Sequence, residues 1–531
     1  MSEPVSPPAW SSNSDGLLVT TARNLSTRYL VLGAEMVIGM LMLPFNLAHL
    51  GAAQYGLWML VGSITVHFSV LDMGYGGATV KFMAQYRAHR DARALNEIAS
   101  TLFYIFAGIG LLAYAGAAVL AFNLDHFFKI GPEQVETGKW LLLIIALFVA
   151  INFPFSVFGG ITGGFQRYDI NNVVSLTTTI VVAIVNVVVL LAGYGLVTLV
   201  ATTTAIRISA YFIYRRNAYR VFPELQIRPS LFCRARLREV TGFSIWAAII
   251  NWAYKLNYQI DGLIVGAFLG SASVSVWAVA ERIINGTQRL TNQFNGVLFP
   301  IIVDRDQRAR REQLQEIVLH GTRLSLMMVL PIAATLVLLA EPLVRAWVGP
   351  SMLGAVPVIQ ILAIVVAIRV GNASGTILLK GAGEIRQLAM VNIATGVANI
   401  ILSALLIRWY GLAGVALGTL IPVALSSIFI LYPSACRNIG LPLRRAVVEA
   451  IFPAVWPALA VGVLLALTRG ISSGTLLAVL LQAAAAFVLY LALFFAVAID
   501  RDDRDLYLGK LLQLVRRVRP SGPRPRSRLA A

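Results

Sequence analysis

Cysteine, histidine and charged residues are all scarce in this chain of 531 residues. It has 2 cysteines and 5 histidines, and only 13% of its residues are charged. Cys233 and Cys436 both lie in polar connecting segments, so the sequence predicts neither a disulfide framework nor a metal site. The motifs His-Glu-x-x-His and Gly-x-x-x-x-Gly-Lys-Ser/Thr are absent, which disfavours a metalloprotease and transport driven by ATP hydrolysis within this chain.

Apolar residues dominate instead, at 58% of the chain with a mean hydropathy of +0.76. A soluble domain is typically about half apolar and about a quarter charged. At about 20–22 residues per helix, this chain supplies about fourteen membrane-spanning helices and leaves no room for a large soluble catalytic domain. The apolar runs are continuous rather than alternating, which argues against an outer-membrane β-barrel. The sequence therefore predicts an all-α polytopic membrane protein.

The expected helices fall into two groups on either side of a polar segment at residues 215–240. We expect them near residues 24–50, 54–76, 98–123, 139–160, 172–194 and 195–214, and near residues 241–268, 272–300, 317–340, 353–379, 387–408, 411–434, 449–468 and 474–498. Prolines lie inside several of them. A kink at such a proline is tolerated where a neighbouring helix satisfies the carbonyl that the missing N–H leaves free.

The positions of Lys and Arg predict how these helices are oriented. In a soluble protein the formal net charge of +18 would suggest a nucleic-acid partner. Here Lys and Arg are concentrated in alternate loops, and the opposite loops hold only five of the 43. Because cytoplasmic loops of membrane proteins are enriched in these residues, we expect a multi-pass inner-membrane protein with both termini in the cytoplasm and no nucleic-acid partner.

Two segments have an amphipathic pattern and are too basic to span a membrane. Residues 78–99 carry Phe82, Met83 and Tyr86 among basic residues, as an interfacial helix does. Residues 506–519 alternate leucine and valine with lysine and arginine, and we expect this helix to bind anionic lipids of the cytoplasmic leaflet. The Pro- and Arg-rich end of the chain, residues 520–531, is predicted to be disordered.

Three short motifs recur at a nearly constant offset. Leu50-Gly51-Ala52-Ala53 returns as Leu269-Gly270-Ser271-Ala272, 219 positions later. Tyr194-Gly195-Leu196 returns as Tyr410-Gly411-Leu412 at an offset of 216, and Gly163-Gly164-Phe165-Gln166 is echoed by Gly381-Ala382-Gly383-Glu384 at 218. The repeat implies a unit of six helices that is used twice in the same orientation. Two such bundles with a site between them are a common plan for alternating access.

The repeat predicts the organisation of the chain. We expect a cytoplasmic segment at 1–23, a first six-helix lobe at 24–214, a basic cytoplasmic linker at 215–240, a second six-helix lobe at 241–435, an extra helix pair at 449–498 and a basic tail at 499–531. The two lobes are expected to surround a central cavity.

The end of the second expected helix carries the run Leu71-Asp72-Met73-Gly74-Tyr75-Gly76-Gly77, followed by Lys81. This run resembles the polysaccharide-transport proteins, the oligosaccharide-lipid flippases of the multidrug/oligosaccharidyl-lipid/polysaccharide exporter superfamily. Residues 163–169, Asp261-Gly262 and Leu298-Phe299-Pro300 are similar to the same family. The resemblance covers about residues 20–435. It implies a cationic cavity between two lobes and movement of a polyprenyl-pyrophosphate-linked oligosaccharide to the outer leaflet, without ATP hydrolysis, for O-antigen or exopolysaccharide synthesis.

Cations inside the expected spans are the candidate substrate-binding residues, because buried charge is costly in a bilayer and usually faces a cavity. Arg282 and Arg289 are seven residues apart, two turns along one face of the eighth helix. Arginine presents several fixed donors to phosphate oxygens, so this pair is suited to a pyrophosphate. The other candidates are Lys255, Arg369 and Arg28. The alternative is a structural role, with Glu281 neutralising an arginine of a neighbouring helix.

Three carboxylates are candidates for ion coupling, namely Asp261, Glu35 and Glu281. Glu35 belongs to a polar stripe of the first helix that also contains Gly39 and Asn46. Asp261 is either a proton or sodium site or a fixed partner for an arginine across the bundle. No cofactor is expected beyond a coupling proton or sodium ion.

A flippase is the leading hypothesis, with polyprenyl-linked glycan, anionic lipids and the polymerase and export components of a polysaccharide pathway as partners. We expect no enzymatic activity. One alternative is an ion-coupled drug or organic-cation antiporter, whose cavity should be acidic and aromatic. A peptidoglycan-precursor flippase differs only in its substrate. A membrane-embedded polymerase or ligase would have a sizeable outer loop, whereas the longest one expected here is about 123–139. A scaffold without transport activity is the remaining alternative.

Overall fold

The computed structural model describes residues 14–72, 75–242, 259–306, 311–468 and 474–499, together with Trp252 and Arg504. Within these residues the chain is helical and contains no strand, which confirms the predicted all-α fold. The predicted tail helix at 506–519, the end of the chain at 520–531, and Lys255 lie outside the described residues.

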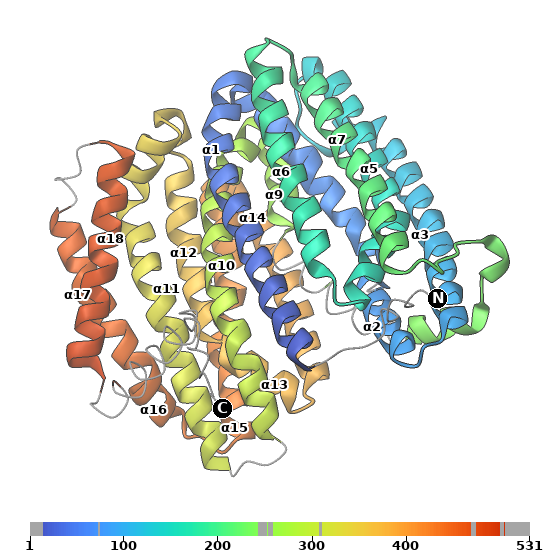
Figure 1. The fold of residues 1–531 in the computed structure, drawn as a ribbon. Coiled ribbons are helices and arrows are strands. Elements are labelled where there is room, and N and C mark those ends of the chain that lie inside the picture. The colour runs from blue at the N-terminus through green and yellow to red at the C-terminus, as the bar shows by residue number, and fades with distance from the viewer. Residues whose placement is uncertain are drawn as a thin grey trace, which may run out of the picture. The chain divides into compact units, whose positions relative to one another are not determined.

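The α-helices overlap the expected ranges in the described part of the chain, although several begin or end at other residues (Figure 1). They are α1 (Ser14–Phe68), α2 (Tyr75–Ala88), α3 (Ala92–Ala121), α4 (Leu124–Phe127), α5 (Pro132–Gly164), α6 (Tyr168–Leu191), α7 (Leu196–Val221), α9 (Asp261–Leu269), α10 (Ser271–Asp306), α11 (Arg311–Trp347), α12 (Ala355–Gly371), α13 (Ala373–Gly381), α14 (Ile385–Leu425), α15 (Tyr432–Asn438), α16 (Leu443–Ala446), α17 (Phe452–Thr468) and α18 (Leu476–Leu493). Three π-helices follow within the last third: η4 (Ser426–Leu431), η5 (Val447–Ile451) and η7 (Phe494–Ala498).

Ten helical stretches of the described chain are long and apolar enough to cross a bilayer. Two of them, Ser26–Phe68 with 43 residues and Arg386–Asn438 with 53 residues, are each long enough for two crossings. Each contains a glycine with a non-helical backbone, Gly51 (φ 75°, ψ 165°) or Gly411 (φ 54°, ψ −132°), so each consists of two helices joined at a glycine. The chain is therefore a multi-pass membrane protein, and the count of about fourteen spans stays a prediction.

The sequence repeat has a counterpart in the backbone. Gly270 (φ 88°, ψ 176°), which corresponds to Gly51 in the repeat, has nearly the same conformation as Gly51, and this region is essentially restricted to glycine. At the next motif, Gln166 (φ 63°) and Gly383 (φ 82°) both adopt the left-handed conformation just after a helix end. These two residues are 217 positions apart, close to the offset of 218 between the Gly-rich motifs.

The chain divides into two compact units by its internal packing. The first contains residues 1–286, 344–365 and 383–429, and the second contains residues 287–343, 366–382 and 430–531. In the first unit α3 packs on α5, α5 on α7, and α6 on both α1 and α7 (Figure 1). In the second unit α13 packs on α15 and α17 on α18. The predicted lobes at 24–214 and 241–435 stay a prediction.

Helix α2 belongs to the protein core of the first unit. The predicted interfacial helix at 78–99 is in fact two helices, because the chain turns at Arg90 (φ 56°) and Asp91 caps the start of α3. Phe82 and Met83 on α2 are 3% and 1% exposed and pack among the aromatic side chains of α3 and α5. The prediction of an interfacial helix was wrong because an amphipathic pattern requires only that one face be covered, and here protein covers it.

The basic segment that follows α7 is held along one face of α3. Asn96 accepts a hydrogen bond from the backbone N–H of Gln226 at 2.8 Å and donates to the carbonyl oxygen of Glu224 at 2.9 Å. One turn further along α3, Ser100 donates to the carbonyl oxygen of Gln226 and accepts from the N–H of Arg228. Thr101 accepts from the N–H of Cys233. These side chains satisfy backbone groups of a segment that forms little secondary structure of its own, so the predicted linker is a docked part of the first unit.

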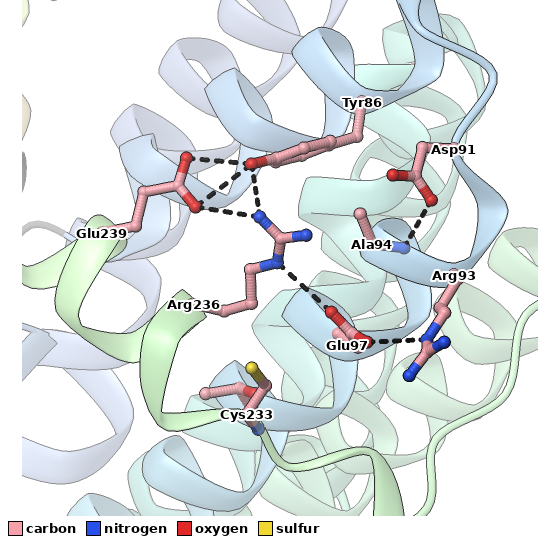
Figure 2. A network of polar contacts seen from close by, with 9 residues as sticks. Tyr86, Asp91, Arg93, Ala94, Glu97, Cys233, Arg236 and Glu239 are labelled. Atoms are coloured by element: carbon pink, nitrogen blue, oxygen red, sulfur yellow. Dashed lines mark hydrogen bonds and ion pairs between the residues drawn. The ribbon is translucent and has the colours of Figure 1, made fainter.

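Arg236, near the C-terminal end of this segment, binds side chains of α2 and α3 (Figure 2). Its guanidinium donates to the Tyr86 hydroxyl at 2.7 Å and forms ion pairs of 3.3 Å with both Glu97 and Glu239. The Tyr86 hydroxyl in turn donates to Glu239 at 2.9 Å. Burial raises the pKa of Tyr86, and the hydrogen bond to Glu239 raises it further. Burial lowers the pKa of Arg236, but its hydrogen bonds to the two carboxylates outweigh this effect and the pKa is raised.

In the second unit, a buried arginine compensates for a proline. Pro453 has no N–H to donate to the preceding turn, where η5 already departs from α-helical geometry. The carbonyl oxygen of Glu449, four residues earlier, accepts a hydrogen bond of 2.8 Å from Nε of Arg323 on α11. Arg323 is 7% exposed. The Arg323 side chain thus joins α11 to the terminal helix pair.

Candidate functional site

The structure places the candidate site residues in different parts of the chain. The first unit contains Arg28 and Glu35 on α1, Asp261 on α9, and Glu281 and Arg282 on α10. The second unit contains Arg289 on α10 and Arg369 on α12. The structure thus brings five of the eight candidates into one compact unit.

Arg282 points from α10 toward α1. Its guanidinium lies directly against Gly39, which is buried, so closely that a β-carbon at that position would overlap the Cζ and Nη2 atoms. A β-carbon on Gly286, one turn further along α10, would lie 3.9 Å from Cε of Met36 and 4.0 Å from Cε of Met40 on α1, which are ordinary van der Waals distances. Helices α1 and α10 therefore face each other in the first unit, with the Arg282 cation on the polar stripe of α1 that the sequence predicted.

A neighbouring helix is hydrogen-bonded to the backbone of α1 at Met40, the residue after Gly39. Pro44 cannot donate to the carbonyl oxygen of Met40, as an ordinary residue four positions later would. That oxygen instead accepts a hydrogen bond of 3.0 Å from Nε1 of Trp347, at the end of α11. The carbonyl oxygen that Pro44 leaves without its usual donor is thus satisfied by a neighbouring helix, and the α1 surface next to Arg282 is held by a side chain of α11.

A tyrosine and a carboxylate complete the surroundings of Arg282. Tyr55, which is 5% exposed on the second half of α1, lies within electrostatic range of both Arg282 and Glu281. Glu281 accepts a hydrogen bond of 3.3 Å from the Asn285 side chain and also lies within range of Asp261. The site therefore combines one cation with two carboxylates rather than a purely cationic surface.

Asp261 belongs to a buried polar cluster between α9 and α14. Its Oδ2 accepts a hydrogen bond of 3.1 Å from the Thr419 hydroxyl, which in turn accepts one of 2.8 Å from Nδ2 of Asn399. All three side chains are buried, as is Ser403 one turn after Asn399. Ser63 lies against Gly262, the residue next to Asp261. The oxygen atoms here are hard donors of the kind that bind a proton or an alkali or alkaline-earth cation.

The other candidates have simpler environments. Glu35 lies within electrostatic range of Arg207 on α7, so the structure gives it a basic neighbour that the sequence did not predict. Arg28 is exposed on the first turns of α1. In the second unit Arg289 is exposed and Arg369 is half-buried.

Sequence reasoning missed Gly39, Thr419 and Asn399 as members of the site. The sequence places Gly39 only on a polar stripe of the first helix. A glycine has no side chain, so its role depends on which residue packs against it. Thr419 and Asn399 are buried polar residues in long apolar helices, and that pattern is a usable signal, since buried polar groups need partners.

The protein matches a known family over more than half its length. A family model described as "Polysaccharide biosynthesis protein" matches residues 50–357. The chain is 22% identical to the "Probable flippase AglR" of Haloferax volcanii over 404 residues, which cover 74% of this chain and 79% of that protein.

Solved structures share the fold. The "Lipid II flippase MurJ, inward closed conformation" matches 90% of this chain and 99% of that chain, with a TM-score of 0.67 and 13% identity. An inward-facing "multidrug resistance MATE family transporter of the MOP superfamily" matches 77% of this chain and 94% of that chain, with a TM-score of 0.64 and 15% identity. The fold is therefore that of these membrane transporters. The family match, which covers more than half of the chain, shows that the chain belongs to the polysaccharide biosynthesis protein family.

Proposed function

We propose that this protein is a flippase that moves a polyprenyl-pyrophosphate-linked oligosaccharide from the cytoplasmic to the outer leaflet, by alternating access of two lobes around a cationic cavity. The diphosphate is the part of this substrate that cannot cross the bilayer unaided, because burying its charge in hydrocarbon is costly. Arg282 binds the diphosphate, and Arg289, Arg369, Lys255 and Arg28 contribute further positive charge along the path.

The position of Arg282 is the observation that supports this proposal most directly. Its guanidinium lies on the polar stripe of α1, next to the buried Gly39, rather than on a surface made only of apolar side chains. A guanidinium in such a place offers a planar set of donors to phosphate oxygens. The names of the relatives favour the same substrate class, since the matched relative from Haloferax volcanii is described as a probable flippase and a matched structure as a lipid II flippase.

Asp261 is the coupling residue in this proposal. A buried carboxylate that accepts from Thr419 and has Asn399 and Ser403 nearby is suited to take up a proton or a sodium ion. Glu281 lies within electrostatic range of both Asp261 and Arg282. Binding of a cation at Asp261 would therefore change the field at Arg282, which gives a physical route from the ion to the substrate charge.

Deletion of the gene in the source organism tests the substrate class. The polyprenyl-linked intermediate should accumulate in the inner leaflet, and mass analysis of extracted lipids would identify its glycan. A full-length copy should reverse the accumulation, whereas an Arg282→Ala copy of equal abundance should not. Unchanged lipid pools together with increased sensitivity to cationic drugs would instead support the antiporter.

A further inference from the structure

We propose that Gly39 is a positioning residue for substrate binding, because its missing side chain provides the space in which the Arg282 guanidinium lies. This inference rests on the role proposed above for Arg282. It goes further in one respect. Binding of the diphosphate depends not only on the charge of Arg282 but also on α1 leaving space for the guanidinium at one position.

The contact itself is specific to the end of the arginine side chain. An ideal β-carbon on Gly39 would lie 2.9 Å from Nε of Arg282 and closer still to Cζ and Nη2, and these three guanidinium atoms are its nearest neighbours. Atoms in this position overlap, so Arg282 and any side chain at residue 39 cannot both keep these positions. The guanidinium is the end of a long flexible chain and can move away.

Gly39 is not required for the backbone conformation. It lies inside α1 and does not have a positive φ, unlike Gly51 further along the same helix. Glycine in a helix interior is less stable than alanine, so helix stability alone would favour a larger residue here. Space for the neighbouring side chain is therefore the physical reason for glycine at this position.

The helix cannot easily move in place of the arginine. The residue after Gly39 is Met40, whose carbonyl oxygen is bonded to Trp347 at 3.0 Å. This hydrogen bond holds the backbone of α1 beside Gly39, whereas the guanidinium is the end of a flexible side chain, so a methyl group at residue 39 should displace the guanidinium rather than the helix.

Two other glycines provide matched controls. Gly33 lies on α1 with open space where its β-carbon would be, so Gly33→Ala tests the effect of alanine in this helix without a contact. Gly286 lies on α10, and a β-carbon there would be 3.9 Å from Met36, an ordinary contact. Gly286→Ala therefore tests the same helix pair without displacing Arg282.

The experiment measures binding of geranyl diphosphate to the purified full-length protein in detergent, with the melting temperature of each variant as a check on folding. Gly39→Ala should weaken binding by about tenfold, as expected when a hydrogen bond to a charged group is lost, while both control variants bind as the wild type does. In an Arg282→Ala background, Gly39→Ala should have no further effect, because no guanidinium remains to be displaced.

The outcomes separate the two proposals. Wild-type binding by Gly39→Ala, with weak binding by Arg282→Ala, would overturn the role of Gly39 and leave the flippase proposal standing. A further loss on adding Gly39→Ala to Arg282→Ala would also overturn it, since the effect would not pass through Arg282. Wild-type binding by Arg282→Ala would contradict the proposed function itself.

Discussion

Asp261 on α9 accepts a hydrogen bond of 3.1 Å from the hydroxyl of Thr419 on α14, and both side chains are buried. A carboxylate in this position keeps its charge only if a cation or donors compensate for the lost water. The pair therefore connects two helices that are far apart in the sequence through a group whose charge state can change.

Replacing this carboxylate should uncouple transport from the ion gradient. Asp261→Asn keeps an acceptor for Thr419 but removes the charge, so we expect transport in proteoliposomes to fall to the level measured without a gradient. Varying sodium at constant pH, and pH at constant sodium, would identify the ion. Glu35→Gln tests the other candidate of α1, whose neighbour is Arg207, and should keep its dependence on the gradient if Asp261 is the coupling residue. Full gradient dependence in Asp261→Asn would exclude this residue as the coupling site.

Arg236 should contribute more to stability than Arg93, although both arginines form an ion pair with Glu97. Arg236 is 26% exposed in its side chain and bonds Tyr86, Glu97 and Glu239, whereas Arg93 is 85% exposed. Arg236→Ala should lower the free energy of unfolding by about 1–3 kcal/mol, since Glu97, Glu239 and the Tyr86 hydroxyl each lose a hydrogen bond to a charged group. Arg93→Ala should cost about 0–1 kcal/mol. Equal effects in a detergent unfolding titration would show that the linker is not held through Arg236.

Arg323 and Pro453 should show non-additive effects on stability. Arg323→Ala removes the donor to the Glu449 carbonyl oxygen and should cost about 1–3 kcal/mol, because a half-buried acceptor loses its hydrogen bond to a charged group. Pro453→Ala restores a backbone N–H that can donate to the same turn. We therefore expect Arg323→Ala to cost less in the Pro453→Ala background, measured by unfolding of the four variants in one detergent. Identical costs in both backgrounds would mean that the arginine does not compensate for the proline.

The helices and the family could be predicted from the sequence because both depend on local patterns. Continuous apolar runs fix where a chain crosses a bilayer, and the glycine of each Leu-Gly-x-Ala motif marks a joint that the backbone confirms at Gly51 and Gly270. Contacts between helices far apart in the sequence could not be predicted in this way. The apolar face of α2 was assigned to lipid rather than protein, and Gly39 acquires a role only when Arg282, more than 240 residues later, lies against it.

Transbilayer movement of a radiolabelled polyprenyl-diphosphate oligosaccharide, measured in proteoliposomes that contain the purified protein, tests the cationic path most directly. We expect the wild-type protein to move the lipid between leaflets, and Arg282→Ala, present at equal amount and equally folded, to lose most of that activity. Equal rates for the two proteins, or no movement by either while an organic cation is exchanged, would contradict a flippase that works through Arg282.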